Sequence, residues 1–131
     1  MVIVDTTVWI DYFRGNASAE SDWLDANLGR QTLAITDLIL CEVLQGVLPE
    51  SAVAKVHREL LKCIIFDTGG QGLAVATAAN YRALRRHGRT VRKIVDCLIA
   101  TFCIQNDHAL LHRDRDFDHF VEFLDLKVIQ P

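Results

Sequence analysis

Two carboxylates in this 131-residue chain follow short apolar runs. Asp5 comes immediately after Val2-Ile3-Val4, and Asp114 comes three residues after the run that ends at Leu111. Neighbouring strands of a parallel sheet end at the same edge, and ligands bind beyond that edge. If both runs are parallel strands, Asp5 and Asp114 are expected to lie together at one edge of the sheet.

Two further acidic residues lie in helix-length segments that are otherwise apolar. Glu42 is the only charged residue between Leu38 and Pro49, and Asp96 is the only one between Ile94 and Ala100. A carboxylate in such surroundings is costly unless it is paired, capped or bound to a cation. A helix that follows a strand begins at the edge where the strand ends, so we expect Glu42 and Asp96 to join the other two acids.

This group of four acids suggests a particular chemistry. Gathered carboxylates repel one another, and their pKa values rise unless a cation lies among them. Oxygen ligands with no cysteine or histidine in position favour Mg²⁺ or Mn²⁺ over zinc. One or two such ions activate a water molecule and stabilise the charge that builds up on a phosphate during in-line displacement. The sequence therefore predicts a metal-dependent hydrolase acting at phosphorus.

Each acid also has an ordinary structural interpretation. Asp5 and Asp96 could cap helices, and Glu42 could be an exposed helical residue. Asp114 and Asp116 could be turn or cap residues before a late helix. A single shared site explains all of them together, whereas the structural interpretation needs a separate reason for each.

The elements that must position these acids follow from hydrophobic patterning. Short apolar runs predict strands at Val2–Val4, Leu33–Ile35, Ile64–Phe66 and Ala109–Leu111, with a fifth at Lys127–Ile129. Helix-length segments lie at Thr7–Phe13, Ala19–Leu28, Leu38–Leu48, Ala52–Lys62, Gln71–His87, Val91–Gln105 and Phe117–Leu124. This alternation predicts an α/β fold, a three-layer α/β/α sandwich with a central parallel sheet of four to five short strands. The length predicts one domain over residues 1–131.

Composition excludes several classes of protein. Half of the residues are hydrophobic and 24% are charged, which excludes a disordered chain. The longest stretch without a charged residue, Thr68 to Tyr81, is shorter than the roughly 18 residues that a membrane span needs. The first residues, Met1 to Asp5, carry no basic leader and do not resemble a signal peptide. We therefore expect a cytoplasmic protein with no membrane segment.

The four cysteines support the same location. Cys41, Cys63, Cys97 and Cys103 lie in apolar surroundings without the Cys-x-x-Cys spacing of zinc sites. Unpaired cysteine is among the most buried residue types, so all four are predicted to pack in the core of a protein from a reducing compartment.

Basic residues are concentrated in one stretch, although the net charge is −3. Six of the fourteen lysines and arginines lie in twelve positions: Arg82, Arg85, Arg86, Arg89, Arg92 and Lys93. Such a run is compatible with a solvated helix end, and equally with a basic approach to an acidic pocket.

Two alternative functions remain open at this stage. Asp5-Thr6-Thr7 after a strand resembles the haloacid-dehalogenase phosphatases, in which the aspartate is a covalent nucleophile, but those enzymes carry a second aspartate where this chain has Thr7. A Mg²⁺-binding receiver-like or inactive binding module is the other alternative, and its match is loose.

The sequence most closely resembles the PIN domain family, and within it the VapC toxins of bacterial and archaeal toxin–antitoxin pairs. Four segments carry the resemblance, in the order and spacing of the family, over essentially the whole chain. They are Val2 to Ile10, Thr36 to Gly46, Val91 to Ala100 and His112 to Phe117.

The resemblance implies an endoribonuclease dependent on Mg²⁺ or Mn²⁺, with activated water attacking RNA phosphodiesters. The acids of the family match Asp5, Glu42, Asp96 and Asp114, with Asp116 as a weaker member of the metal site. Thr6 and Thr7 match positions where a small hydroxyl residue helps to hold the first aspartate and the metal-bound water. The family also implies a homodimer and a cognate antitoxin, typically a small DNA-binding protein whose tail covers the active site.

The basic stretch acquires a function in this context. Arg82, Arg85, Arg86, Arg89 and Arg92 are predicted to contact RNA phosphates on either side of the cleaved bond. The same segment offers no evident aromatic platform for stacking bases, so it does not predict that the bases are read.

Overall fold

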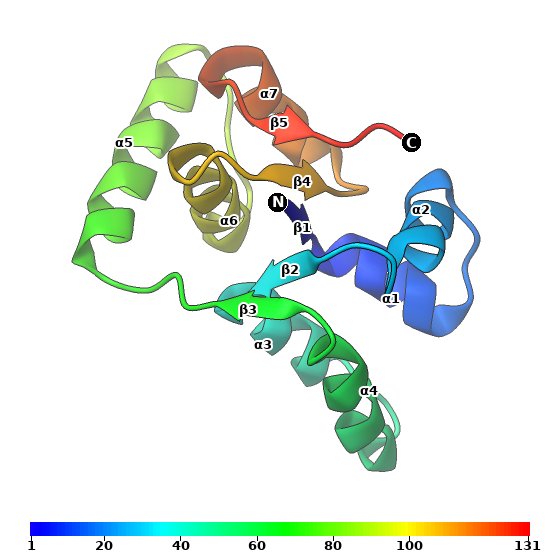
Figure 1. Cartoon of the computed structure of the whole chain (residues 1–131). Helices are drawn as coiled ribbons and strands as arrows, with labels where there is room; N and C mark the ends of the chain where they lie inside the picture. Colours follow the sequence, from blue (N-terminus) through cyan, green and yellow to red (C-terminus); the bar gives the residue numbers. More distant parts are fainter.

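The apolar runs form a five-stranded parallel sheet in the computed structural model, which describes residues 1–131 (Figure 1). The strands are β1 (Val2–Val4), β2 (Leu33–Thr36), β3 (Ile64–Phe66), β4 (Ala109–Leu111) and β5 (Lys127–Val128). Their order across the sheet is β3-β2-β1-β4-β5, and every neighbouring pair is parallel. The predicted sheet is confirmed, with each strand within one residue of its expected bounds.

Seven α-helices and two short 3-10 helices connect the strands. The helices are α1 (Thr6–Arg14), α2 (Ala19–Asn27), α3 (Asp37–Gln45), α4 (Val53–Leu60), α5 (Gln71–Arg86), α6 (Ile94–Gln105) and α7 (Asp118–Leu124), with η1 (Glu50–Ala52) and η2 (Arg115–Phe117). In Figure 1, α5 and α6 lie on one side of the sheet and α1 and α2 on the other. The three-layer α/β/α architecture is thus confirmed.

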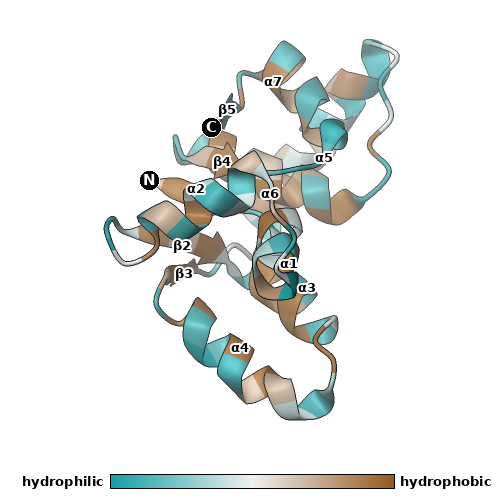
Figure 2. Ribbon diagram, turned by 90° about the vertical axis from the view of Figure 1, so that its right-hand side faces the viewer, coloured by the Kyte–Doolittle hydropathy of each residue, from teal (hydrophilic) through white to brown (hydrophobic).

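The three central strands, β1, β2 and β4, are largely buried because helices cover both faces of the sheet. Ile3, Val4, Ile35, Leu110 and Leu111 are completely buried, and they share one core with residues from the helices. Figure 2 shows the strands β2 and β3 in the brown of hydrophobic residues, whereas α4 carries both brown and teal positions. None of the helices combines the length and apolar character needed to cross a bilayer.

The chain order reverses between β1 and β4. The chain proceeds from β1 outward to β2 and β3, and then returns to the other side of β1 as β4. Such a switch point opens a crevice beyond the carboxyl ends of the two strands, where open α/β sheets bind ligands. Receiver-type folds have the order 2-1-3-4-5 instead, so the topology argues against the receiver-like alternative.

Three expectations from the sequence were inaccurate, one of them the end of α3, which lies at Gln45 and not at Leu48. Cys63, Cys97 and Cys103 are buried free thiols, but Cys41 is exposed, so the prediction of core packing was wrong for this residue. Because α3 buries Ile39 and Val43, a residue two positions from each of them points away from the core. The helix expected from Val91 begins only at Ile94, after an extended approach through Lys93.

Candidate metal centre

Asp5 lies where β1 passes into α1. Its backbone is extended, and its side chain caps the helix: Oδ2 accepts hydrogen bonds from the amide of Thr7 at 3.1 Å and from the Thr7 hydroxyl at 2.7 Å. Burial above all, and nearby Glu42 to a smaller extent, raise the pKa of Asp5 to about 6 against the opposing effect of these bonds. The capping interpretation and the position at the sheet edge therefore hold together for this residue.

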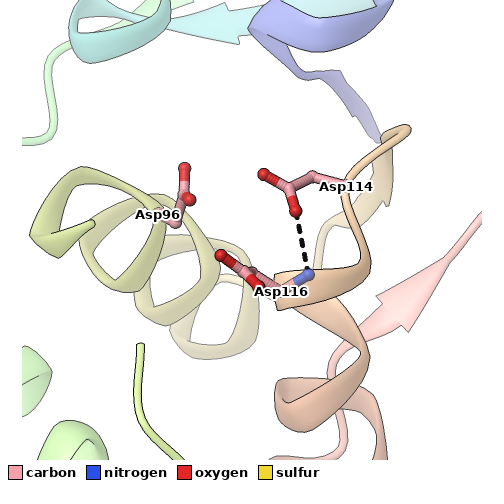
Figure 3. A group of neighbouring side chains, drawn as sticks. All are labelled: Asp96, Asp114 and Asp116. Carbon is pink, nitrogen blue, oxygen red and sulfur yellow. Dashed lines mark hydrogen bonds between the residues drawn. The ribbon is translucent and has the colours of Figure 1, made fainter. Parts of the chain in front are cut away.

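Asp114 and Asp116 lie in the turn after β4. Asp114 caps η2, because its Oδ1 accepts a hydrogen bond from the amide of Asp116 at 2.9 Å. The Asp116 carboxylate lies 3.3 Å from the guanidinium of Arg92, which is exposed. Both carboxylates are partly accessible to solvent and both face the start of α6 (Figure 3).

Asp96 lies in the first turn of α6 and is only 6% exposed. Its Oδ2 is buried and has no hydrogen-bond partner. Burial above all, together with the charges of Asp5, Asp114 and Glu42, raises its pKa to about 7, while Lys93 acts in the opposite direction. A buried carboxylate oxygen without a donor, surrounded by other carboxylates, is an arrangement that a bound cation would stabilise.

The closest group consists of Asp96, Asp114 and Asp116. One carboxylate oxygen of each lies within 4.8 Å of the others, and Figure 3 shows the three side chains directed into the space between α6 and the turn after β4. An all-oxygen donor set without cysteine or histidine suits Mg²⁺ or Mn²⁺. The residues present therefore fit a hard divalent cation.

Asp5 and Glu42 do not belong to this group, although their charges act on Asp96. Glu42 lies on α3 and accepts a hydrogen bond at Oε1 from the Thr6 hydroxyl at 2.8 Å. The start of α3 is fixed by Thr36, whose hydroxyl accepts from the amide of Ile39, and by Asp37, whose carboxylate accepts from Thr68. Thr6 and Thr7 thus each hold one of the two acids from the N-terminal half of the chain.

The turn between β4 and η2 carries a residue that the sequence did not reveal. The amide of Asp114 donates a hydrogen bond to Nδ1 of His112 at 3.1 Å. Burial lowers the pKa of His112, against the opposing effect of nearby carboxylates that include Asp118 and Asp114. A bond between a side chain and an amide two residues away depends on the ring's rotamer, so no residue pattern indicated it.

The basic stretch is exposed and runs along α5 into the following turn. Arg82, Arg85 and Arg86 lie on α5, and Arg89 follows it. The ring of Phe123 from α7 lies 5.7 Å from the Arg89 guanidinium, and His87 stacks on the same ring at 4.2 Å. The basic stretch itself offered no evident aromatic platform, but Phe123, from a distant segment of the chain, packs against Arg89 and His87.

Comparison with known proteins identifies the family. Residues 2–122 match the PIN domain family. VapC ribonuclease Mb1587 of Mycobacterium bovis and ribonuclease VapC11 of Mycobacterium tuberculosis are each 32% identical to this chain over 129 residues, which is 97% of this chain and 96% of theirs. The structure of VapBC2 from Rickettsia felis bound to a promoter DNA fragment has the same fold, with a TM-score of 0.78 at 16% identity over 98% of both chains. With its sheet order, its acidic residues at the switch point and these matches, the chain belongs to the PIN domain family and, within it, to the VapC proteins.

Proposed function

We propose that this protein is a single-domain, divalent-metal-dependent endoribonuclease toxin. The observation that carries the proposal is the Asp96 carboxylate: its Oδ2 is buried without a hydrogen-bond donor, and one of its oxygens lies within 4.8 Å of carboxylate oxygens of Asp114 and Asp116. The relatives that are named ribonucleases support RNA as the substrate, because they match over nearly the whole chain.

Asp96, Asp114 and Asp116 would hold the cation, and the charges of Asp5 and Glu42 act on the same centre. A bound Mg²⁺ or Mn²⁺ supplies a water of lowered pKa and stabilises negative charge on the phosphate. The protein contributes orientation: Thr7 fixes Oδ2 of Asp5, and Thr6 fixes Oε1 of Glu42. Carboxylates held this way keep their position while the charge on the phosphate develops.

The covalent phosphatase alternative receives no support from this geometry. Its second aspartate would stand at position 7, where the Thr7 hydroxyl instead donates to Oδ2 of Asp5. Asp5 is 2% exposed, which is poor access for a nucleophile that must meet a phosphate ester.

Incubation of the purified protein with a mixed tRNA and mRNA pool tests the proposal. We expect discrete fragments in Mg²⁺ or Mn²⁺ and none in excess chelator. Hydrolysis of a small phosphate ester without RNA cleavage would support the phosphatase instead. Cleavage that persists in chelator would contradict the metal-dependent mechanism.

Replacement of Thr6 by valine is expected to lower RNA cleavage about tenfold, because outer-shell partners of metal ligands typically carry effects of this size. Valine keeps the shape of threonine but removes the hydroxyl that donates to Glu42. Initial cleavage rates at saturating Mg²⁺ measure the effect. Thr77→Val is the matched control, because Thr77 is a buried threonine on α5 whose hydroxyl has no partner. Equal rates in the two variants would show that the bond to Glu42 is unimportant.

The exposed arginines are proposed to bind RNA phosphates. Replacement of Arg82, Arg85, Arg86 and Arg89 together by glutamine is expected to weaken RNA binding and to flatten its salt dependence. For a single strand, every phosphate that is no longer neutralised reduces the slope of log affinity against log salt by about 0.7. Fluorescence anisotropy at several salt concentrations, with an uncleaved RNA in chelator, measures that slope. A matched pair of exposed arginines elsewhere, Arg30 and Arg58, should leave it unchanged.

We also include a cognate antitoxin, a homodimer and a cytoplasmic location in the proposal. Solved structures with this fold include a toxin–antitoxin complex from Klebsiella pneumoniae and VapBC proteins bound to DNA from Rickettsia felis and Salmonella typhimurium. An apolar groove of about 400 Å³ between α1, α3 and α4 offers a surface for a protein partner. It is lined by residues such as Phe13, Val47 and Leu48, and the Leu48 side chain is 87% exposed.

The cytoplasmic location is proposed because four unpaired thiols fit a reducing compartment.

A further inference from the structure

The turn that carries Asp114 and Asp116 is held by two hydrogen bonds in series. The amide of Asp114 donates to Nδ1 of His112 at 3.1 Å, and the amide of Asp116 donates to Oδ1 of Asp114 at 2.9 Å. The first bond fixes the backbone from which the Asp114 side chain departs. The second places Asp116 relative to that side chain. The spacing of the two carboxylates therefore depends on a hydrogen-bond acceptor at position 112.

His112 is itself anchored to the core. Its ring packs against Phe117 with centroids 4.9 Å apart, and Phe117 is completely buried. An Nδ1 that accepts a hydrogen bond belongs to a neutral imidazole with its proton on Nε2. The ring thus presents an acceptor from a position that side-chain packing defines.

Arg113, the residue between His112 and Asp114, connects this turn to the part of the site that contains Asp5. The amide of Arg113 donates to the Thr7 hydroxyl at 3.0 Å, and that hydroxyl donates to Asp5. The Arg113 guanidinium pairs with Asp11 of α1 at 2.6 Å. Arg113 therefore fixes the turn to α1, whereas His112 is the residue that orients Asp114.

We infer that His112 is a positioning residue of the metal centre. Its Nδ1 holds the Asp114 amide and so sets the orientation of Asp114 and Asp116 toward Asp96. This inference rests on the proposed metal-dependent function. His112 is not a member of the group that could hold the cation, and its Nδ1 is occupied by the amide of Asp114.

Two isosteric substitutions separate the acceptor from the packing. Asparagine places a carbonyl oxygen near the position of Nδ1. Leucine has nearly the same shape as asparagine but accepts no hydrogen bond. We expect His112→Leu to weaken Mn²⁺ binding about tenfold or more, as is typical for outer-shell partners, and His112→Asn to stay within about threefold of the wild type. His112→Phe keeps the ring against Phe117 and is expected to behave as the leucine variant does.

Isothermal titration calorimetry with Mn²⁺, without RNA, measures the binding, and thermal unfolding in chelator shows that each variant is folded. His57→Leu, on α4 and remote from the acids, is the control and should bind as the wild type does.

Wild-type affinity in the leucine and phenylalanine variants would overturn the inference and leave the metal centre intact. Equal loss in the asparagine and leucine variants would overturn it too, since the acceptor would then be irrelevant. Absence of Mn²⁺ binding in the wild type would overturn the metal centre itself, and with it this function of His112.

Discussion

Asp96→Asn is expected to reduce metal-dependent RNA cleavage by more than about 100-fold. The carboxylate is the most buried member of the closest acidic group, and its Oδ2 has no other partner. Because even outer-shell substitutions at metal sites cost about 10–100-fold, removal of a ligand charge should cost more. Initial rates with Mg²⁺ and with Mn²⁺, using wild-type and variant protein purified identically, measure this loss.

The same substitution is expected to stabilise the metal-free protein. An ionised Asp96 is destabilising there because it is buried and repelled by Asp5, Asp114 and Glu42. Asparagine removes the charge and keeps the shape. Urea unfolding in chelator at pH 8 should therefore give a higher midpoint for the variant than for the wild type. Asp25→Asn, an exposed aspartate on α2 outside the closest group, should change neither activity nor midpoint. An active variant, or one that is inactive only because it is unfolded, would contradict this role for Asp96.

The metal-free protein is expected to become more stable as the pH is lowered from about 8 toward 5. Its pKa values of about 6 for Asp5 and about 7 for Asp96 both lie above the ordinary value of 3.8. The folded state therefore binds protons that the unfolded state has already released, and stability rises as the pH falls through these values. Each pKa unit corresponds to about 1.4 kcal/mol, so the change over this window amounts to several kcal/mol. Urea unfolding at pH 5, 6, 7 and 8 in chelator measures it.

Saturating Mn²⁺ should reverse this trend, because the cation and the proton compete for the same carboxylates. Stabilisation by the metal is expected to be small at pH 5 and large at pH 8. The double variant Asp5→Asn, Asp96→Asn provides the control and should lose both the pH dependence and the response to metal in this range. A wild-type protein whose stability falls toward pH 5 in parallel with the double variant would show that these two carboxyls are not the source.

The strands β1, β2 and β4 could be predicted from the sequence because each is a short apolar run in the core of the protein, and β3 is a similar run at the edge of the sheet. The gathering of the acids at one edge followed from parallel topology alone, since Asp5 and Asp114 each follow a strand. Which of the acids lie closest to one another could not be predicted from the topology, because this depends on where each side chain points. Asp116 belongs to the closest group with Asp96 and Asp114, whereas Asp5 and Glu42 lie beyond it.

The features that could not be predicted from the sequence are contacts between distant segments and contacts that depend on a particular rotamer. Phe123 lies beneath Arg89 and His87 although it belongs to α7, and nothing in the basic stretch indicates this. Arg92 pairs with Asp116, and the phosphate contact expected of Arg92 stays a prediction beside this ion pair. Cys41 is exposed because helical periodicity, and not residue type, decides which side of α3 it occupies.

The central claim is that these carboxylates gather a divalent cation, and anomalous diffraction tests it most directly. Crystals grown with Mn²⁺ and measured at an energy above the manganese absorption edge reveal every ordered ion. We expect an anomalous peak bounded by the carboxylates of Asp96, Asp114 and Asp116, which is lost in crystals of Asp96→Asn. Fully ordered acidic side chains without a peak among them, or a peak that persists in the variant, would contradict the claim.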